Sequence, residues 1–126
     1  MEILVCLNDC LLKQLLCLLL NISQKQELCS ETKIHIIHSN LSKKQVTRIH
    51  RFAKCLSLKI KTYQIPDSLC AEFPYWGHGS PANYYRLFFS DIVDHNSTKI
   101  LYLDLDLLIL NDLSELYNLD LKNHII

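Results

Sequence analysis

The sequence predicts an α/β domain built on a mostly parallel sheet flanked by helices, and three observations support this fold class. Strand-like apolar runs alternate with helix-like stretches along the 126 residues, in the order β-α-β-α-β-α-β. Only two glycines and three prolines occur, which favours long regular elements. The composition, 49% apolar and 21% charged, is that of a compact chain with a hydrophobic core. Strands separated by helices are expected to run parallel, through right-handed crossovers.

The first strand and the first helix are predicted from the N-terminal residues. Residues 1–7 form a short apolar run, typical of a strand buried on both faces. Residues 8–9, Asn-Asp, supply a turn and the N-cap of a helix that runs to about Ser23. The leucine-rich stretch 15–20 is too short to cross a bilayer, which needs about 20 residues. We therefore expect a helix buried on most sides, with Cys17 as a small buried hydrophobe.

The middle of the chain predicts two more strands and a second helix. Residues 33–38 read as a strand, and Ser42 and Gln45 have the spacing of a capping box. The helix that follows should run from residue 43 to about 56, and four apolar residues at helical spacing form its inner stripe: Val46, Ile49, Phe52 and Ala53. Residues 59–65 alternate between polar and apolar side chains, as in a half-exposed strand.

One extended loop precedes the last helix and strand. Residues 66–81 hold every proline and glycine of the chain. Ser80 or Pro81 should open a helix that carries an apolar and aromatic set: Tyr84, Tyr85, Leu87, Phe88, Ile92 and Val93. Residues 98–103 then predict a fourth strand, and residues 107–110 continue in apolar fashion.

Two carboxylates interrupt this last apolar stretch. Asp104 and Asp106 follow the fourth strand directly, at the strand end where parallel sheets bind ligands. Residues i and i+2 of an extended chain point to one side, so both side chains can face one ion. Carboxylates in an apolar run are costly unless a charge meets them, and Mg²⁺ or Mn²⁺ takes such ligands together with phosphates. The alternative is a plain turn satisfied by backbone amides, which the neighbouring leucines disfavour.

Charge and cysteine content exclude several classes of function. The chain has 13 basic and 13 acidic residues, so its balanced charge predicts no bulk attraction to nucleic acid or to an anionic membrane. Its six cysteines include no Cys-x-x-Cys pair, and the N-terminus has no basic export signal. We therefore expect reduced cysteines and a cytoplasmic protein. His35 and His38, three apart on a strand, should face opposite sides and cannot share a metal. His78 either lines an acceptor cleft or is a plain loop histidine.

Three motifs in matching order resemble glycosyltransferase family 8, which includes bacterial lipopolysaccharide galactosyl- and glucosyltransferases and the glycogenins. Residues 102–109, Tyr-Leu-Asp-Leu-Asp-Leu-Leu-Ile, and the following Asp-Leu-Ser-Glu-Leu of 112–116 are similar to its Tyr-Leu-Asp-x-Asp strand end and the short helix beyond it. Residues 83–87, Asn-Tyr-Tyr-Arg-Leu, resemble its Tyr-x-Arg-Leu helix. Residues 1–9 resemble its first strand and uracil-binding turn. The resemblance therefore spans the chain.

This resemblance implies a GT-A, Rossmann-like fold in which residues 1–126 form the part that binds a UDP-sugar and Mn²⁺ or Mg²⁺. It implies that Asp104 and Asp106 are the metal ligands, with Asp104 also near the sugar or ribose. Arg86 would face the donor sugar or diphosphate, where a guanidinium can make bidentate hydrogen bonds; the alternative is a surface ion pair. Asn8 would meet the uracil edge. The implied activity is a retaining, metal-dependent transfer of a hexose to a saccharide or glycolipid acceptor. No transmembrane segment is expected, which leaves room for peripheral contact at the inner face of a membrane.

The sequence also departs from the family pattern. Cys10 and Leu11 stand where the family often has an aromatic residue that stacks on uracil. The family's third metal ligand is a later histidine, and His124 comes too soon after the Asp-x-Asp pair to take that role. Residues 122–126 resemble the start of the family's next strand, so we expect the front part of such a domain, without its acceptor-binding part and with its catalytic residues unidentified.

Three functional hypotheses follow. The first is the hexosyltransferase, and the second is a non-catalytic remnant that binds nucleotide and metal at most. The third, an Asp-x-Asp phosphotransferase, is disfavoured because its first aspartate would be a nucleophile after the first strand, whereas this chain has Asn8-Asp9 there and its pair after the fourth strand.

Overall fold

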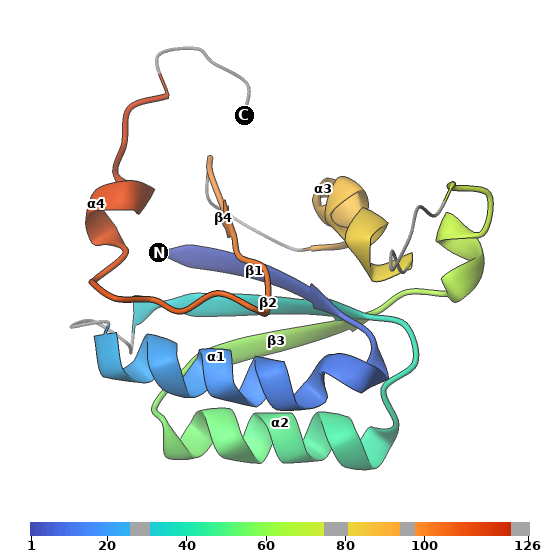
Figure 1. The fold of residues 1–126 in the computed structure, drawn as a ribbon, viewed down its shortest axis with the longest axis horizontal. Helices are drawn as coiled ribbons and strands as arrows, with labels where there is room; N and C mark the ends of the chain where they lie inside the picture. The colour runs from blue at the N-terminus through green and yellow to red at the C-terminus, as the bar shows by residue number, and fades with distance from the viewer. Residues whose placement is uncertain (26–30, 75–80, 94–97, 122–126) are drawn as a thin grey trace.

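The computed structural model describes residues 1–25, 31–74, 81–93 and 98–121, which form a sheet with helices on both faces (Figure 1). The sheet has four strands in the order β3-β2-β1-β4, and all three pairings are parallel. The strands are β1 (Glu2–Leu7), β2 (Lys33–His38), β3 (Lys59–Gln64) and β4 (Leu101–Tyr102). The predicted α/β class with a parallel sheet is confirmed.

Two layers of helix cover the sheet (Figure 1). α1 (Leu12–Lys25) and α2 (Lys43–Cys55) pack on one face, and the 3-10 helix η4 (Pro81–Phe88) with the short α3 (Phe89–Ile92) lies on the other. Because side chains alternate along a strand, β1 contributes to both cores. Its residues Ile3, Val5 and Leu7 pack with α1 and α2, whereas Leu4 and Cys6 join the core on the η4 side.

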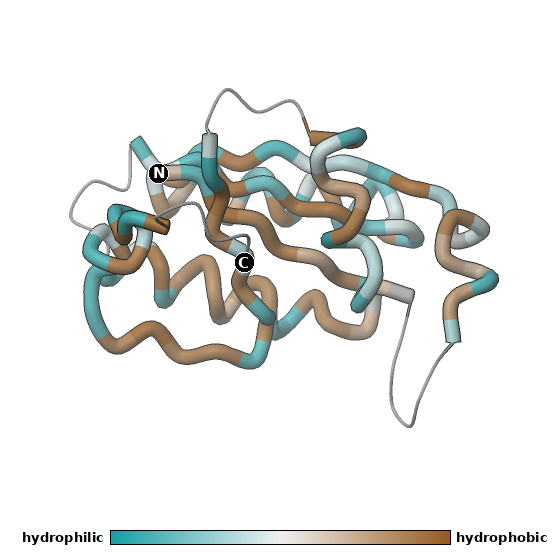
Figure 2. The backbone as a smooth tube through the Cα atoms, turned by 90° about the horizontal axis from the view of Figure 1, so that it is seen from above, coloured by the Kyte–Doolittle hydropathy of each residue, from teal (hydrophilic) through white to brown (hydrophobic). Residues whose placement is uncertain are grey.

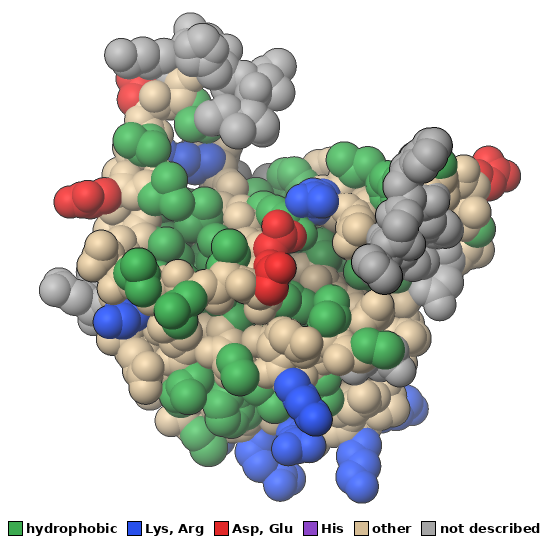
Figure 3. Space-filling view, in the orientation of Figure 1, with side chains coloured by type: hydrophobic (Ala, Val, Ile, Leu, Met, Phe, Trp, Pro, Cys, Tyr) green, Lys and Arg blue, Asp and Glu red, His purple; other side chains and the backbone are tan. Residues whose placement is uncertain are grey.

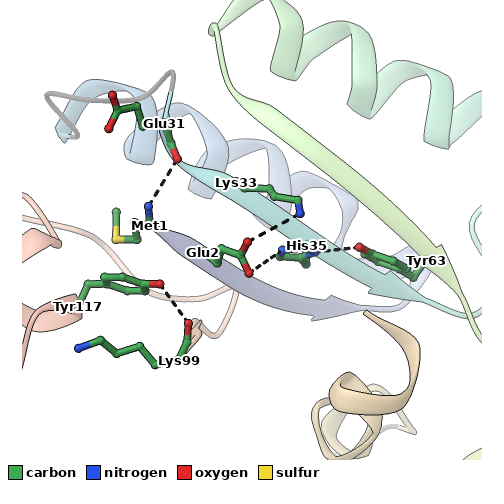
Figure 4. Close-up of polar contacts among 8 residues, drawn as sticks. All are labelled: Met1, Glu2, Glu31, Lys33, His35, Tyr63, Lys99 and Tyr117. Carbon is green, nitrogen blue, oxygen red and sulfur yellow. Dashed lines mark hydrogen bonds and ion pairs between the residues drawn. The ribbon is translucent and has the colours of Figure 1, made fainter. Parts of the chain in front are cut away.

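All six residues of β1 are buried, as predicted for a central parallel strand, and they include one acid. The Glu2 carboxylate lies 3.7 Å from Lys33 Nζ and 3.5 Å from His35 Nε2, both on the neighbouring β2 (Figure 4). His35 Nδ1 lies 3.0 Å from the Tyr63 hydroxyl of β3. His38, in contrast, lines a groove with residues of α2 on the opposite face. The two histidines therefore face opposite sides of the sheet, as predicted.

The first helix differs from its prediction in two ways. A 3-10 turn, η1 (Asp9–Leu11), follows β1, and α1 begins only at Leu12. The buried residues of α1 lie on one face: Leu15, Leu18, Leu19 and Ile22. Cys17 is exposed, so its predicted burial was wrong, because it projects from the side away from that stripe. The five cysteines that the structure describes form no disulfide with one another. None of the described helices is long and apolar enough to cross a membrane.

The second helix closely follows its prediction. The Ser42 hydroxyl accepts a hydrogen bond from Gln45 N–H at 3.3 Å, and Gln45 Oε1 accepts one from Ser42 N–H at 2.8 Å. This reciprocal capping box begins α2 at the predicted residue. Ile49 and Ala53 are buried against the sheet. Ser57, with a φ of 57°, then turns the chain into β3 in the left-handed region.

The second half of the chain is less regular than predicted. The helix expected from Pro81 is mainly the 3-10 helix η4, in which Tyr85 is 1% exposed but Leu87 is 62% exposed. Its apolar residues therefore do not share one buried stripe, which a regular amphipathic helix would need. The predicted strand 98–103 pairs with β1 over only two residues, and the Leu103 N–H adds a further hydrogen bond to Leu4 O at 2.9 Å.

Between Asp106 and α4 (Ser114–Tyr117), residues 107–110 form a hydrophobic segment at the outside of the molecule (Figure 2). Ile109 is buried, but its leucine neighbours are exposed: Leu107 by 48%, Leu108 by 73% and Leu110 by 69%. Asn21 of α1 holds this segment, since its Nδ2 donates to Ile109 O at 3.1 Å and its Oδ1 accepts from Ile109 N–H at 2.6 Å. One amide side chain thus takes the place of a strand partner. The short helix expected at 112–116 is α4, whose Ser114 N–H donates to Asp112 Oδ1 at 2.7 Å.

Replacement of Asn21 by alanine should destabilise the fold, because it leaves the Ile109 N–H and carbonyl without partners. We expect the free energy of unfolding to fall by about 1–3 kcal/mol, the usual cost of an unsatisfied partly buried group. Urea denaturation followed by far-UV circular dichroism measures this change. Gln24→Ala on the exposed side of the same helix is the control. An equal loss in both variants would contradict the role of Asn21.

Candidate functional site

A cavity of about 380 Å³ opens at the carboxyl ends of β1 and β4. Its lining comes from β1, η1, α1, η4 and the residues around β4: Cys6, Leu11, Gln14, Ala82, Asn83, Arg86, Tyr102, Asp104, Leu105 and Asp106. In the space-filling view a group of acidic side chains lies near the end of β4, with basic side chains close by (Figure 3). The structure therefore brings three of the four predicted site residues, Arg86, Asp104 and Asp106, to one cavity.

The two aspartates reach the cavity because they alternate with buried leucines. Leu103 and Leu105 are 5% and 9% exposed and pack in the core beneath α1 and α2. Asp104 and Asp106 are exposed on the opposite side of the chain. The carboxylates share a side, as predicted. The expectation that they lie in a costly apolar setting was wrong, because the leucines take the buried positions and leave the charges in water.

Tyr102 orients the first aspartate. Its hydroxyl donates a hydrogen bond to Asp104 Oδ1 at 2.6 Å. Burial, and next this hydrogen bond, hold the pKa of the Tyr102 hydroxyl well above its ordinary value, so it stays a neutral donor. In the described part of the chain, Asp104 Oδ2 and both oxygens of Asp106 accept no hydrogen bond. These oxygens remain available to a ligand.

Arg86 stacks on the same tyrosine. Its guanidinium carbon lies 4.6 Å from the centre of the Tyr102 ring, and its Nε donates to Asn83 O at 2.9 Å. Such a cation–π contact contributes about 0.5–1 kcal/mol at an exposed site. Arg86 is exposed and forms no ion pair within 4.0 Å among the described residues, which leaves the surface ion pair without support. The guanidinium is therefore positioned without being neutralised.

Cys6 lies at the base of the cavity as a neutral thiol. Burial raises its pKa to about 12; the charge of Asp104 acts in the same direction and that of Arg86 against it. A thiol that stays protonated at neutral pH is a poor nucleophile and a poor metal ligand. Cys6 therefore shapes the cavity rather than supplying its chemistry.

Asn8 follows β1 at the same edge of the sheet but does not line the cavity. Its side-chain oxygen is buried and has no hydrogen-bond partner among the residues that the structure describes. Of the two residues at the family's aromatic position, Leu11 lines the cavity and Cys10 is exposed. The contact of Asn8 with uracil stays a prediction. His78 and His124 lie outside the described residues.

Sequence reasoning did not assign four polar cavity residues to the site: Cys6, Gln14, Asn83 and Tyr102. Two of them could have been found from their spacing to a predicted site residue. Tyr102 is two residues before Asp104 on extended chain and so shares its side, and Asn83 is one helical turn before Arg86. No sequence pattern placed Cys6 and Gln14 at the site, because only the pairing of β1 with β4 brings β1 and α1 close to the two aspartates.

The donor set fits a hard divalent cation in part. Asp104 and Asp106 offer exposed carboxylate oxygens, the ligands that Mg²⁺ and Mn²⁺ take along with phosphate oxygens and water. Across the described ranges, no group of three or more histidine, cysteine, aspartate or glutamate side chains is arranged to hold a metal. Two protein ligands suit a cation whose other ligands come from a substrate.

Comparison with known proteins finds relatives of this chain, one of which is named a glycosyltransferase. Glycosyltransferase GlyF of Streptococcus pneumoniae is 25% identical over 94 residues, which are 75% of this chain and 23% of GlyF. General stress protein A of Bacillus subtilis is 26% identical over 105 residues, 82% of this chain and 35% of that protein. The chain thus spans about a quarter to a third of the length of these relatives.

Solved structures show the same fold. Galactosyltransferase LgtC, in complex with donor and acceptor sugar analogs, matches with a TM-score of 0.82 at 23% identity, over 96% of this chain and 43% of LgtC. GlyE of Streptococcus pneumoniae matches with a TM-score of 0.66 at 19% identity, over 95% of this chain and 27% of GlyE. The fold is therefore the GT-A fold expected from the sequence.

The family model described as glycosyl transferase family 8 matches residues 3–126, nearly the whole chain. Its match agrees with the order of the three motifs and with the fold. The chain belongs to glycosyl transferase family 8.

Proposed function

We propose that this chain forms the donor-binding part of a glycosyltransferase that moves a hexose from a UDP-sugar to a saccharide or glycolipid acceptor, with retention at the anomeric carbon. The observation that carries the proposal is one cavity, at the carboxyl edge of a parallel sheet, lined by Asp104, Asp106 and Arg86. Membership of family 8 supports the reaction class. The proposed acceptors include the glycans of bacterial lipopolysaccharide.

The charges of the cavity suit a nucleoside diphosphate. A diphosphate needs positive charge around it, and the Arg86 guanidinium can donate two parallel hydrogen bonds to phosphate or sugar oxygens. Asp104 and Asp106 would hold Mn²⁺ or Mg²⁺, which supplies Lewis-acid stabilisation of the charge that builds on the leaving diphosphate. The carboxylates have no role toward an anionic substrate without such a cation, because they would repel it.

The remaining cavity residues support this arrangement. Tyr102 fixes Asp104 through its hydroxyl and Arg86 through its ring, so the anionic and the cationic group are held by one side chain. Leu103 and Leu105 anchor the backbone on either side of Asp104 in the core. Such preorganisation lowers the cost of ordering the groups when substrate binds.

A second candidate function is a non-catalytic nucleotide-binding remnant. It is favoured by the small number of protein ligands, because Asp104 and Asp106 bring two carboxylates to the cavity and no third metal-ligating side chain joins them in the described ranges. In this case UDP and Mn²⁺ bind, but no sugar is released from a UDP-sugar. Calorimetry together with an assay of donor hydrolysis separates the two functions: binding without turnover supports the remnant, and measurable turnover by the chain excludes it.

Asp104→Asn and Asp106→Asn should each abolish Mn²⁺-dependent binding of UDP, because an amide keeps the shape but lacks the charge. Isothermal titration of UDP with and without Mn²⁺ measures this effect, and we expect a loss of at least tenfold, or about 1.4 kcal/mol. Asp91→Asn, exposed on α3 and outside the cavity, is the matched control and should bind as the unaltered chain does. Unchanged affinity in both site variants would exclude the metal assignment.

Tyr102→Phe and Arg86→Lys separate the two contacts of the tyrosine. Tyr102→Phe removes the hydrogen bond to Asp104 but keeps the ring, so we expect a several-fold weaker affinity for Mn²⁺ with UDP. Arg86→Lys keeps the charge but loses the planar fork, and should weaken UDP binding by about tenfold with little change in Mn²⁺ affinity. The same titrations measure both effects. If Arg86→Lys binds UDP normally, the guanidinium does not contact the diphosphate.

A further inference from the structure

The zero net charge of this chain conceals a strong separation of charge along the sequence. Residues 32–66 contain no aspartate or glutamate, yet they hold eight of the 13 basic residues: Lys33, Lys43, Lys44, Arg48, Arg51, Lys54, Lys59 and Lys61. Five of these eight lie on α2. The zero net charge predicted no bulk attraction to nucleic acid or to an anionic membrane, and that expectation therefore does not apply to this part of the surface.

The α2 cations share one side of the helix. Lys44, Arg48, Arg51 and Lys54 follow one another at intervals of four, three and three residues, and Lys43 adjoins them. All five are exposed, whereas the buried residues Ile49 and Ala53 lie on the opposite side. Among the described residues the ion pairs within 4.0 Å join Glu2 to Lys33 and to His35, so the α2 cations form no ion pair there.

The fold gains little from these charges. The first turn of α2 contains Lys43 and Lys44 and no acid, although the positive end of the helix dipole favours acidic residues there. Like charges at i and i+4, such as Lys44 and Arg48, repel each other. The capping box starts the helix despite this repulsion. An unpaired basic face that weakens its own helix points to an anionic partner outside the chain.

We propose that the outer face of α2 docks this chain on an anionic lipid bilayer. Thirteen helical residues give a straight row about 20 Å long, which suits a flat surface. The anionic leaflet of a membrane attracts such polybasic segments, at about fivefold in partitioning for each lysine or arginine. Phe52 of α2 packs inward with the core, and the one ring that this helix exposes is the imidazole of His50, whose Nε2 lies 3.1 Å from Thr62 Oγ1. This face therefore offers little surface on which nucleic-acid bases could stack.

Docking by this face leaves the candidate donor site open. Basic side chains gather along the lower edge of the molecule, where α2 lies, and the acidic side chains seen in that view lie away from them (Figure 3). No exposed large apolar residue lies on α2, so the contact would be electrostatic and would not insert into the hydrocarbon. This inference goes beyond the proposed function and does not depend on the metal assignment.

Sedimentation of the chain with lipid vesicles tests the proposal. Vesicles of phosphatidylcholine with added phosphatidylglycerol should bind the chain, and vesicles of phosphatidylcholine alone should not. Salt of about 1 M, where the screening length is about 3 Å, should release it. The double variant Lys44→Gln/Lys54→Gln should lower the partition coefficient on anionic vesicles about 25-fold, at about fivefold per lysine.

The matched control is Lys13→Gln/Lys25→Gln, which removes two exposed lysines from the first and last turns of α1 instead. We expect it to keep binding within a few-fold of the unaltered chain, and circular dichroism checks that both variants are folded. Equal losses in the two double variants would overturn the assignment to α2. Failure of the unaltered chain to bind anionic vesicles would overturn the proposal. So would tighter binding to a nucleic-acid duplex than to the vesicles.

Discussion

The parallel pairing of the buried strand β1 is the constraint on which the rest of this structure depends. β1 lies between β2 and β4, and its alternating side chains enter two separate cores. The α1 and α2 layer and the 3-10 helix η4 are therefore both positioned by one strand of six residues. The Leu4 carbonyl, which accepts the Leu103 N–H, also sets the position of the aspartates that follow. A shift of one residue in this pairing would exchange the leucines with the aspartates and bury the charges.

The candidate site combines groups of opposite charge without letting them neutralise each other. Tyr102 separates Arg86 from Asp104, since the Arg86 guanidinium stacks on the Tyr102 ring while the Tyr102 hydroxyl donates a hydrogen bond to the Asp104 carboxylate. A direct ion pair would satisfy both groups and leave less for a ligand. The same separation appears across the molecule, where the carboxylates lie at the cavity and the unpaired cations lie on α2. A neutral total is thus compatible with two surfaces of different chemistry.

Elements with a strong local signal were predictable, and elements that depend on distant partners were not. The capping box of Ser42 and Gln45 and the apolar runs of β1 and β2 identified α2 and the first strands to within a residue or two. The long apolar stretch of α1 did not show which side of the helix is buried, so Cys17 was wrongly expected to be buried. η4 and β4 were predicted as longer and more regular elements. Their form depends on what packs against them, and the sequence pattern does not contain that information.

The sequence by itself determined the fold class, the order of the strands along the chain and the pair of aspartates at a strand end, because periodicity and spacing are local properties. It also contained the run of cations without acids, which the total charge obscured. Only the tertiary structure decided which residues share the cavity. Cys6 on β1, Gln14 on α1 and Arg86 on η4 meet Asp104 because β1 pairs with β4 and because η4 packs across the sheet. Contacts of this kind arise from packing between elements, and no local pattern encodes them.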